Sequence, residues 1–273
     1  MTKINTIING FVDLNLELDE NSSTRIVDEN IIESDLGIIN IDLNDQIITT
    51  LSTRSIVTEN NRIELSSPKE KILQNIGIND IESVNLMSLQ GSRLYGVNKI
   101  SSDWDLTLVT TSINSYDFRE TVINGEEYDF HIYSPNKFQE KLNNHNMREL
   151  EVLFHPDKFR IIEKFEYFVD LDKEKLVQTV KKESDELWKR GEEILNEDKF
   201  DSYRALKSIW HSFRFLIFAK QILETGSINN FSEANFLYEP IVKSKQKDFS
   251  YFDTNFRALR DSLKDELDNY IVE

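Results

Sequence analysis

Hydrophobic and polar positions follow two different periods along this chain. In residues 1–66 short apolar runs such as residues 11–18 alternate with polar positions, and clusters of Asn, Asp and Ser separate these runs. A period of two is the pattern of a strand with one wet face. We therefore expect residues 1–66 to form a short β-rich extension, although their acidity is equally typical of a partly disordered arm.

A second region begins after this extension. Ser67-Pro68 forms an N-cap with proline in the first turn, and the helix that it opens should stop at Gly77. The apolar run of residues 84–89 then leads into the turn-prone sequence Gln90-Gly91-Ser92. This pattern predicts a buried strand that ends in a tight turn.

Two further strands and a hairpin follow. Residues 104–109 alternate as a strand with one wet face would, and residues 117–123 and 126–133 flank Asn124-Gly125. Asn-Gly between two strand patterns is the strongest short hairpin signal in a sequence. Asp129 is therefore expected within the second arm of a hairpin.

The apolar period becomes helical from Pro135 and should break at His155-Pro156. Beyond about residue 172 every pattern is helical, without an internal repeat. The candidate helices are residues 174–195, 201–224, 232–238 and 255–270. We expect an α+β chain in three parts: the extension (1–66), a catalytic domain (67–171) and a helical substrate-binding domain (172–273).

Composition narrows the function. The 273 residues include no cysteine, and the four histidines lack ligand spacing, so neither disulfides nor structural zinc are expected. No apolar run approaches the roughly 18 residues of a membrane span, and the start lacks a signal pattern. We expect a cytoplasmic protein with no membrane partner. The net charge of -17 argues against non-specific coating of nucleic acid, so any polynucleotide contact must be local.

Three aspartates are the candidate catalytic residues and metal ligands. On a strand, Asp103 and Asp105 leave the same face about 6.6 Å apart. That spacing suits a pair of Mg²⁺ ions, for which Mn²⁺ can substitute, and Asp129 on a neighbouring strand can complete the site and accept a proton. The alternative is a solvent-facing acidic strand, because Asp-x-Asp alone is more often structural than catalytic.

Several residues are candidates for binding a nucleoside triphosphate. The backbone at Gly91 and Ser92 can approach phosphate oxygens closely, and Arg93 follows directly. Lys207, His211 and Arg214 are spaced by four and three, which places them on one helix face. For Arg93 a cap on the sheet edge is an equal alternative, and for the helix face an exposed surface paired with nearby acids is an equal alternative.

Taken together and in order, these motifs resemble the DNA polymerase beta superfamily of nucleotidyltransferases. The narrower resemblance is to the predicted nucleotidyltransferases linked to RNA repair, and it covers about residues 68–240. It is carried by Gly91-Ser92-Arg93-Leu94-Tyr95-Gly96, by Ser101-Ser102-Asp103-Trp104-Asp105-Leu106 and by Tyr128-Asp129-Phe130-His131-Ile132-Tyr133.

The resemblance implies a small mixed sheet flanked by helices, a helical substrate domain, magnesium, and transfer of a nucleoside monophosphate from a triphosphate such as ATP to a hydroxyl. An RNA end, a protein and a small molecule all remain open as acceptors, as do the base of the nucleotide and the oligomeric state. The alternative function is a non-catalytic module that senses a nucleotide or binds a partner protein.

Overall fold

The computed structural model describes residues 63, 65–99, 101–197 and 201–271 in full, and the backbone of six strands within the first 50 residues. The chain divides into two compact units, residues 1–57 and 58–273. In the first unit β1 and β2 form an antiparallel pair and β3 to β6 a second antiparallel sheet. These strands are β1 Thr2–Ile8, β2 Val12–Leu18, β3 Thr24–Asp28, β4 Ile31–Ser34, β5 Gly37–Ile41 and β6 Ile47–Ile48. The predicted β-rich extension is confirmed, while Phe11 of the predicted run lies outside the described residues.

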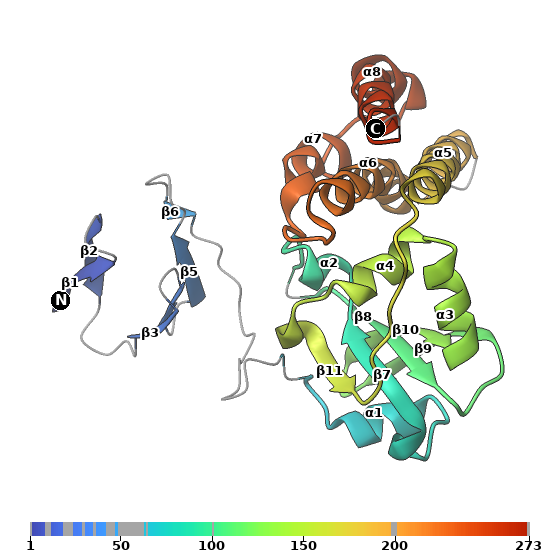
Figure 1. Cartoon of the computed structure of the whole chain (residues 1–273). Helices are drawn as coiled ribbons and strands as arrows, with labels where there is room; N and C mark the ends of the chain where they lie inside the picture. Colours follow the sequence, from blue (N-terminus) through green and yellow to red (C-terminus); the bar gives the residue numbers. More distant parts are fainter. Residues whose placement is uncertain are drawn as a thin grey trace. The chain divides into compact units, whose positions relative to one another are not determined.

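The second unit is built on one five-stranded mixed sheet with the order β11-β7-β8-β10-β9 (Figure 1). β8 and β10 run parallel, and the other neighbours pair antiparallel. The strands are β7 Val84–Leu89, β8 Trp104–Thr110, β9 Tyr116–Ile123, β10 Glu126–Tyr133 and β11 Arg160–Glu163. The α+β class, with a mixed sheet and flanking helices, is confirmed.

The predicted hairpin joins β9 to β10. Asn124 and Gly125 both have positive φ, 54° and 86°. A two-residue loop with two positive φ values matches the right-handed twist of the strands that it joins. Because this turn fixes the β9–β10 register, it also sets which residue of β9 lies beside Asp129, namely Glu120.

Helices cover both faces of this sheet and form the C-terminal half of the unit (Figure 1). The α-helices are α1 Lys69–Asn75, α2 Gly91–Leu94, α3 Pro135–Asn143, α4 Met147–Leu153, α5 Lys173–Asn196, α6 Ser202–Thr225, α7 Tyr238–Val242 and α8 Phe249–Asp268. The short 3-10 helices are η1 Ile81–Ser83, η2 Asp157–Phe159 and η3 Glu233–Leu237. No helix among the described residues is long and apolar enough to cross a membrane.

The structure differs from the predicted elements in four places. The helical stretch after Pro135 is divided into α3 and α4, because His145 adopts a left-handed φ of 58° that ends the first helix. Residues 232–238 form mainly the 3-10 helix η3, and the last helix begins earlier than predicted, at Phe249. β11 was not predicted, since four residues are too few to show a period.

The two long helices α5 and α6 pack closely around a glycine. Gly191 lies in the interior of α5, where a Cβ would meet Ile209 Cγ1 at 2.5 Å and the carbonyl oxygen of Ala205 at 3.1 Å. Both contacts belong to α6. The absence of a side chain at this position therefore sets how closely the two helices approach each other.

We expect Gly191→Ala to lower the free energy of unfolding, although alanine is the better helix former by about 1 kcal/mol. The added methyl group overlaps Ile209 and crowds the Ala205 carbonyl, and overpacking of this kind costs about 1–3 kcal/mol. Urea unfolding followed by circular dichroism measures the change. The exposed Lys189→Ala in the same helix is the control; equal or greater stability of the glycine variant would contradict the close packing.

Candidate functional site

Three aspartates converge on one face of the sheet. Asp105 in β8 and Asp129 in β10 are direct partners in the parallel register, so their side chains leave the same face. Asp103 lies just before β8 begins. One carboxylate oxygen from each of the three lies within 4.8 Å of the others. The three residues that the sequence proposed as metal ligands are thus brought together.

The aromatic residue between the first two aspartates points the other way. Trp104 is buried in the core, and its ring stacks on that of Tyr128 with centroids 6.1 Å apart. Its indole Nε1 donates to Glu126 Oε2 at 2.7 Å. Trp104 therefore fixes the first residue of β8, and with it the direction in which the Asp105 side chain leaves the strand.

The closeness of the carboxylates changes their acidity. Burial and then the negative charge of Asp103 raise the pKa of Asp105 to about 6, against the effect of Lys207, Arg148 and a hydrogen bond from the Ser92 backbone. Burial, followed by the charges of Asp105 and Asp103, raises the pKa of Asp129 to about 6 as well. Carboxylates that repel each other and are partly desolvated can hold a cation, because a bound cation relieves both penalties.

The turn after β7 touches the carboxylates directly. Gly91 has a φ of +71°, and a Cβ on it would lie 1.7 Å from Asp105 Oδ2. The N–H of Gln90 donates to the carbonyl oxygen of Asp105 at 2.7 Å. Only glycine allows this backbone to pass so close to the carboxylate. The turn predicted to hold phosphate therefore lies against the aspartate predicted to bind metal.

Ser92 and Arg93 follow in the short helix α2. The hydroxyl of Ser92 is buried and has no hydrogen-bond partner among the described residues. Arg93 donates to the carbonyl oxygen of Ser102 at 2.7 Å, and its guanidinium carbon lies 4.0 Å from the centre of the Trp104 ring. Arg93 thereby holds the backbone that presents Asp103.

The three residues of the predicted basic face of α6, Lys207, His211 and Arg214, have different surroundings. Lys207 lies near enough to Asp105 to oppose the rise in its pKa. Burial, followed by the charges of Arg214 and Lys207, lowers the pKa of His211 well below its usual value, so this histidine is neutral. Its Nδ1 is buried without a partner in the part of the chain that the structure describes.

Arg214 lies in a buried contact rather than in an open cleft. Its Nη2 donates to Glu151 Oε1 at 3.0 Å, and its guanidinium carbon lies 3.8 Å from the centre of the Tyr95 ring. The hydroxyl of Tyr95 donates to Glu151 Oε2 at 2.5 Å. This buried triad connects α6 with α4 and with the end of α2, so it joins the helical half to the Gly91 turn. Triphosphate binding by Arg93, Lys207, His211 and Arg214 stays a prediction.

Sequence reasoning missed two residues that support the site. The Gln90 side chain accepts a hydrogen bond from Thr107 Oγ1 at 2.7 Å and donates to the carbonyl oxygen of Arg148 at 3.2 Å. Arg148 lies beside His131, with Nη1 3.0 Å from its Nδ1. Burial and then Arg148 lower the pKa of His131 to about 3. Nothing in the sequence around Arg148 indicates these contacts, because α4 and β10 meet only in the folded chain.

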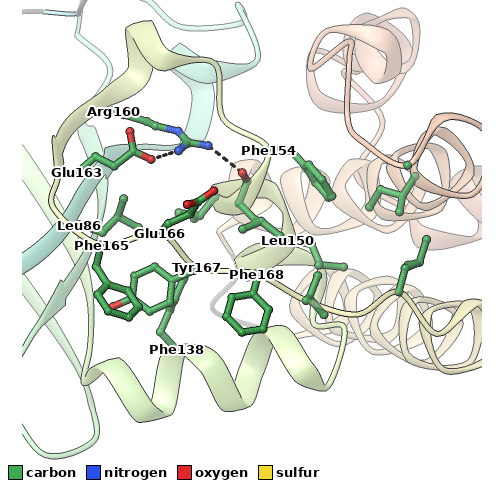
Figure 2. A pocket seen from close by; sticks show the side chains of 16 residues that line it. Leu86, Phe138, Leu150, Phe154, Arg160, Glu163, Phe165, Glu166, Tyr167 and Phe168 are labelled. Carbon is green, nitrogen blue, oxygen red and sulfur yellow. Dashed lines mark hydrogen bonds and ion pairs between the residues drawn. The ribbon is translucent and has the colours of Figure 1, made fainter.

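A separate pocket lies away from the carboxylates (Figure 2). It has a volume of about 360 Å³ and is lined mainly by apolar side chains, among them Phe138, Phe165 and Phe168. Arg160 forms an ion pair with Glu163 at its edge and donates to the carbonyl oxygen of Leu153 at 2.9 Å. None of the three aspartates lines this pocket, so it takes no part in the candidate metal site.

Gly91→Ala should disable the site while the chain stays folded, because the new methyl group would take the space of the Asp105 carboxylate. Gly96→Ala is a matched control: Gly96 has the same φ of +71° but open space around its Cβ. Both variants bear the strain of an alanine at positive φ, about 1–2 kcal/mol. Isothermal titration with Mn²⁺ should detect binding in the Gly96 variant and none in the Gly91 variant; equal affinities would contradict the close approach.

Affinity for a divalent cation should fall as the pH falls through about 6, because protons compete for Asp105 and Asp129. Without the cation, the folded chain binds more protons than the unfolded chain between pH 3.8 and about 6. The stability contributed by these groups therefore declines as the pH rises through that window. Thermal unfolding with and without Mg²⁺ should show a larger stabilisation at pH 7.5 than at pH 5. A stabilisation that does not depend on pH would argue against cation binding at these carboxylates.

Comparison with known proteins finds similarity to solved structures. No protein-family model matches the sequence, and no curated protein matches it. The structure is similar to the crystal structure of a nucleotidyltransferase-like protein from Exiguobacterium sibiricum 255-15, with 11% identity over 75% of this chain and 74% of that chain and a TM-score of 0.29. With so low a TM-score the similarity carries no argument about function. The interpretation of the site depends on the carboxylates and the turn of this chain.

Proposed function

We propose that this chain is a divalent-metal-dependent nucleotidyltransferase, which moves a nucleoside monophosphate from a nucleoside triphosphate to a hydroxyl and releases pyrophosphate. The observation that carries the proposal is the contact between two elements. Three carboxylates lie within 4.8 Å of one another, and the Gly91 turn passes directly against one of them. A cation site alone does not require a glycine turn at that point, whereas a site for a metal-bound phosphate does.

The carboxylates suit Mg²⁺, which prefers hard oxygen ligands and is commonly held by one or two carboxylates together with substrate phosphates. Asp103, Asp105 and Asp129 would hold the metal, and a pair of such ions supplies charge stabilisation to the entering and leaving oxygens of an in-line displacement. The chain itself supplies the spacing of the ligands, through the parallel pairing of Asp105 with Asp129.

We assign triphosphate binding to the side of Asp105 that lies against the Gly91 turn. The backbone at Gly91 and the unpartnered hydroxyl of Ser92 can donate to phosphate oxygens, and Lys207 adds a positive charge near Asp105. His211 is neutral, so its unpartnered Nδ1 can form a hydrogen bond but adds no charge. Each guanidinium group of Arg93 and Arg214 donates to a protein group, and Nε and Nη1 of Arg214 are buried without a partner among the described residues, so Arg214 can also donate to a phosphate.

Asp129 is the group to which we assign the proton of the attacking hydroxyl. As the hydroxyl oxygen bonds to the α-phosphorus, the bond from phosphorus to the pyrophosphate oxygen breaks, and Asp129 takes the proton. A carboxylate whose pKa is raised to about 6 accepts a proton more readily than an ordinary aspartate. His131, two residues along β10, is kept neutral and is held by Tyr116 and Arg148.

Asp105→Asn should reduce transfer by about 10³-fold or more, because the reaction depends on charge stabilisation at the metal site. The measurement is pyrophosphate release with Mg²⁺ and each of four α-labelled triphosphates, in the presence of RNA, peptide and small hydroxyl acceptors. Asp129→Asn should lose transfer but keep some triphosphate binding, since Asp105 remains.

The exposed Asp265→Asn in α8 changes the same functional group far from the sheet and should behave as the wild type. Full turnover by a folded Asp105 variant would disprove the assignment. Metal-dependent triphosphate binding without pyrophosphate release in the wild type, across all acceptors, would instead favour a nucleotide sensor.

A further inference from the structure

An exposed row of side chains lies on β9, next to the carboxylates. Tyr116, Phe118 and Val122 are 44%, 42% and 63% exposed and occupy alternate positions of this strand. Phe118 is the direct partner of His131, and Glu120 the direct partner of Asp129. Because direct partners share a sheet face, this row lies on the same face as Asp129, at the free edge of the described sheet.

Charge is divided unequally across that face. Two cations, Lys207 and Arg148, lie near enough to Asp105 to oppose the rise in its pKa, and Arg148 also lies beside His131 and Tyr116. After burial, all the charges that most affect Asp129 are negative: Asp105, Asp103, Glu120 and Glu127. The part of the site beside Asp105 therefore suits phosphates, and the part of β9 beside Glu120 and Glu127 suits a neutral or positively charged group.

This inference rests on the proposed function, in which the leaving pyrophosphate and the attacking hydroxyl lie on opposite sides of the site. In an in-line displacement the attacking oxygen and the leaving group lie on opposite sides of the phosphorus. Gly91 follows β7 and contacts Asp105, so the pyrophosphate leaves on the β8 side of the sheet. The hydroxyl consequently approaches from the side of Asp129 and β9.

The size of the row and its charge indicate the kind of acceptor. From Tyr116 to Val122 the strand rises about 20 Å, which is longer than a small molecule and suits an extended peptide. Exposed apolar side chains at every second position fit alternate side chains of such a peptide. Phosphates of a nucleic acid would meet Glu120 and Glu127 here, whereas Arg148 lies at the other end of the row, beside Tyr116 and His131.

We propose that the acceptor is a Ser, Thr or Tyr hydroxyl in an extended, basic polypeptide segment that lies over the β9 row. Its apolar side chains contact Phe118 and Val122, and its Lys or Arg side chains pair with Glu120 and Glu127. The hydroxyl oxygen bonds to the α-phosphorus, pyrophosphate leaves, and the proton passes to Asp129. The product is a polypeptide that carries a nucleoside monophosphate in a phosphodiester bond.

The test uses the full-length protein, Mg²⁺ and the four α-labelled nucleoside triphosphates. Acceptors are short peptides with a central Ser, Thr or Tyr flanked by Arg or by Glu, single-stranded RNA with a free 3′ hydroxyl, and small amino alcohols. Triphosphate binding is measured separately by equilibrium dialysis. We expect label in the Arg-flanked peptides at a rate about tenfold or more above the Glu-flanked peptides, and none in RNA.

Each other outcome overturns the inference. Transfer to RNA ends, transfer to amino alcohols in preference to peptides, or equal labelling of both peptide sets would assign the β9 side to a different acceptor. Triphosphate binding without label in any peptide would exclude a polypeptide acceptor while leaving the metal and nucleotide site intact. Failure of the wild-type chain to bind a metal-bound triphosphate would instead show that the proposed function itself is wrong.

A charge-reversal variant at Glu120 tests peptide recognition separately from the transfer reaction. Glu120→Lys should reverse the preference between Arg-flanked and Glu-flanked peptides, and the ratio of the two rates cancels any effect on Asp129. Glu70→Lys in α1 makes the same change in net charge, and α1 packs against the opposite face through the hydrogen bond from Arg119 to the Ile76 carbonyl. This control should keep the original preference; an unchanged preference in the Glu120 variant would contradict the inference.

Discussion

Mutual repulsion among three carboxylates is the constraint on which this molecule depends. Asp103, Asp105 and Asp129 offer oxygens within 4.8 Å of one another on a partly buried sheet face. Burial and the negative neighbours raise the pKa of Asp105 and Asp129 to about 6. At neutral pH the folded chain therefore holds negative charges whose proximity and burial are unfavourable. Strand pairing keeps them together because Asp105 and Asp129 are fixed by a parallel ladder and not by their own side-chain contacts.

Lys207 in the helical half supplies a positive charge near Asp105. The buried triad of Arg214, Glu151 and Tyr95 sets the position of the helix that carries it. Arg214 on α6 binds Glu151 on α4 and lies over Tyr95, which follows the phosphate turn. Removing one member of such a buried pair leaves an uncompensated charge, which typically costs about 3–5 kcal/mol. Lys207 lies two helical turns before Arg214 on the same helix, so the triad that joins α6 to the sheet also determines how near Lys207 comes to Asp105.

Local signals in the sequence predicted much of this arrangement, and long-range packing accounts for what they missed. The bounds of β7 and the positive φ values at Asn124-Gly125 follow from an apolar run and from turn chemistry, which act over a few residues. The pairing of Asp129 with Asp105 needed the register of two strands far apart in sequence. For Arg214 the helical period gave the face but not its surroundings, because a positive residue on an amphipathic helix can meet either solvent or a buried glutamate. Arg148 gave no signal, since its neighbours come from β10 and β9.

Repulsion within the carboxylate cluster also bears on the proposal that metal binding and proton transfer take place at one site. A cation bound to the three aspartates would relieve the repulsion that the fold imposes. Relief of this repulsion would contribute to the affinity for the cation and would stabilise the folded chain. The cation also lowers the pKa of the carboxylates that it binds, which opposes the use of Asp129 as a proton acceptor. Glu120 and Glu127 act in the opposite direction, because their negative charges raise the pKa of Asp129. They are not among the main influences on the pKa of Asp105. In the proposed reaction the charges of Glu120 and Glu127 therefore keep Asp129 basic, which distinguishes its proposed role from that of Asp105.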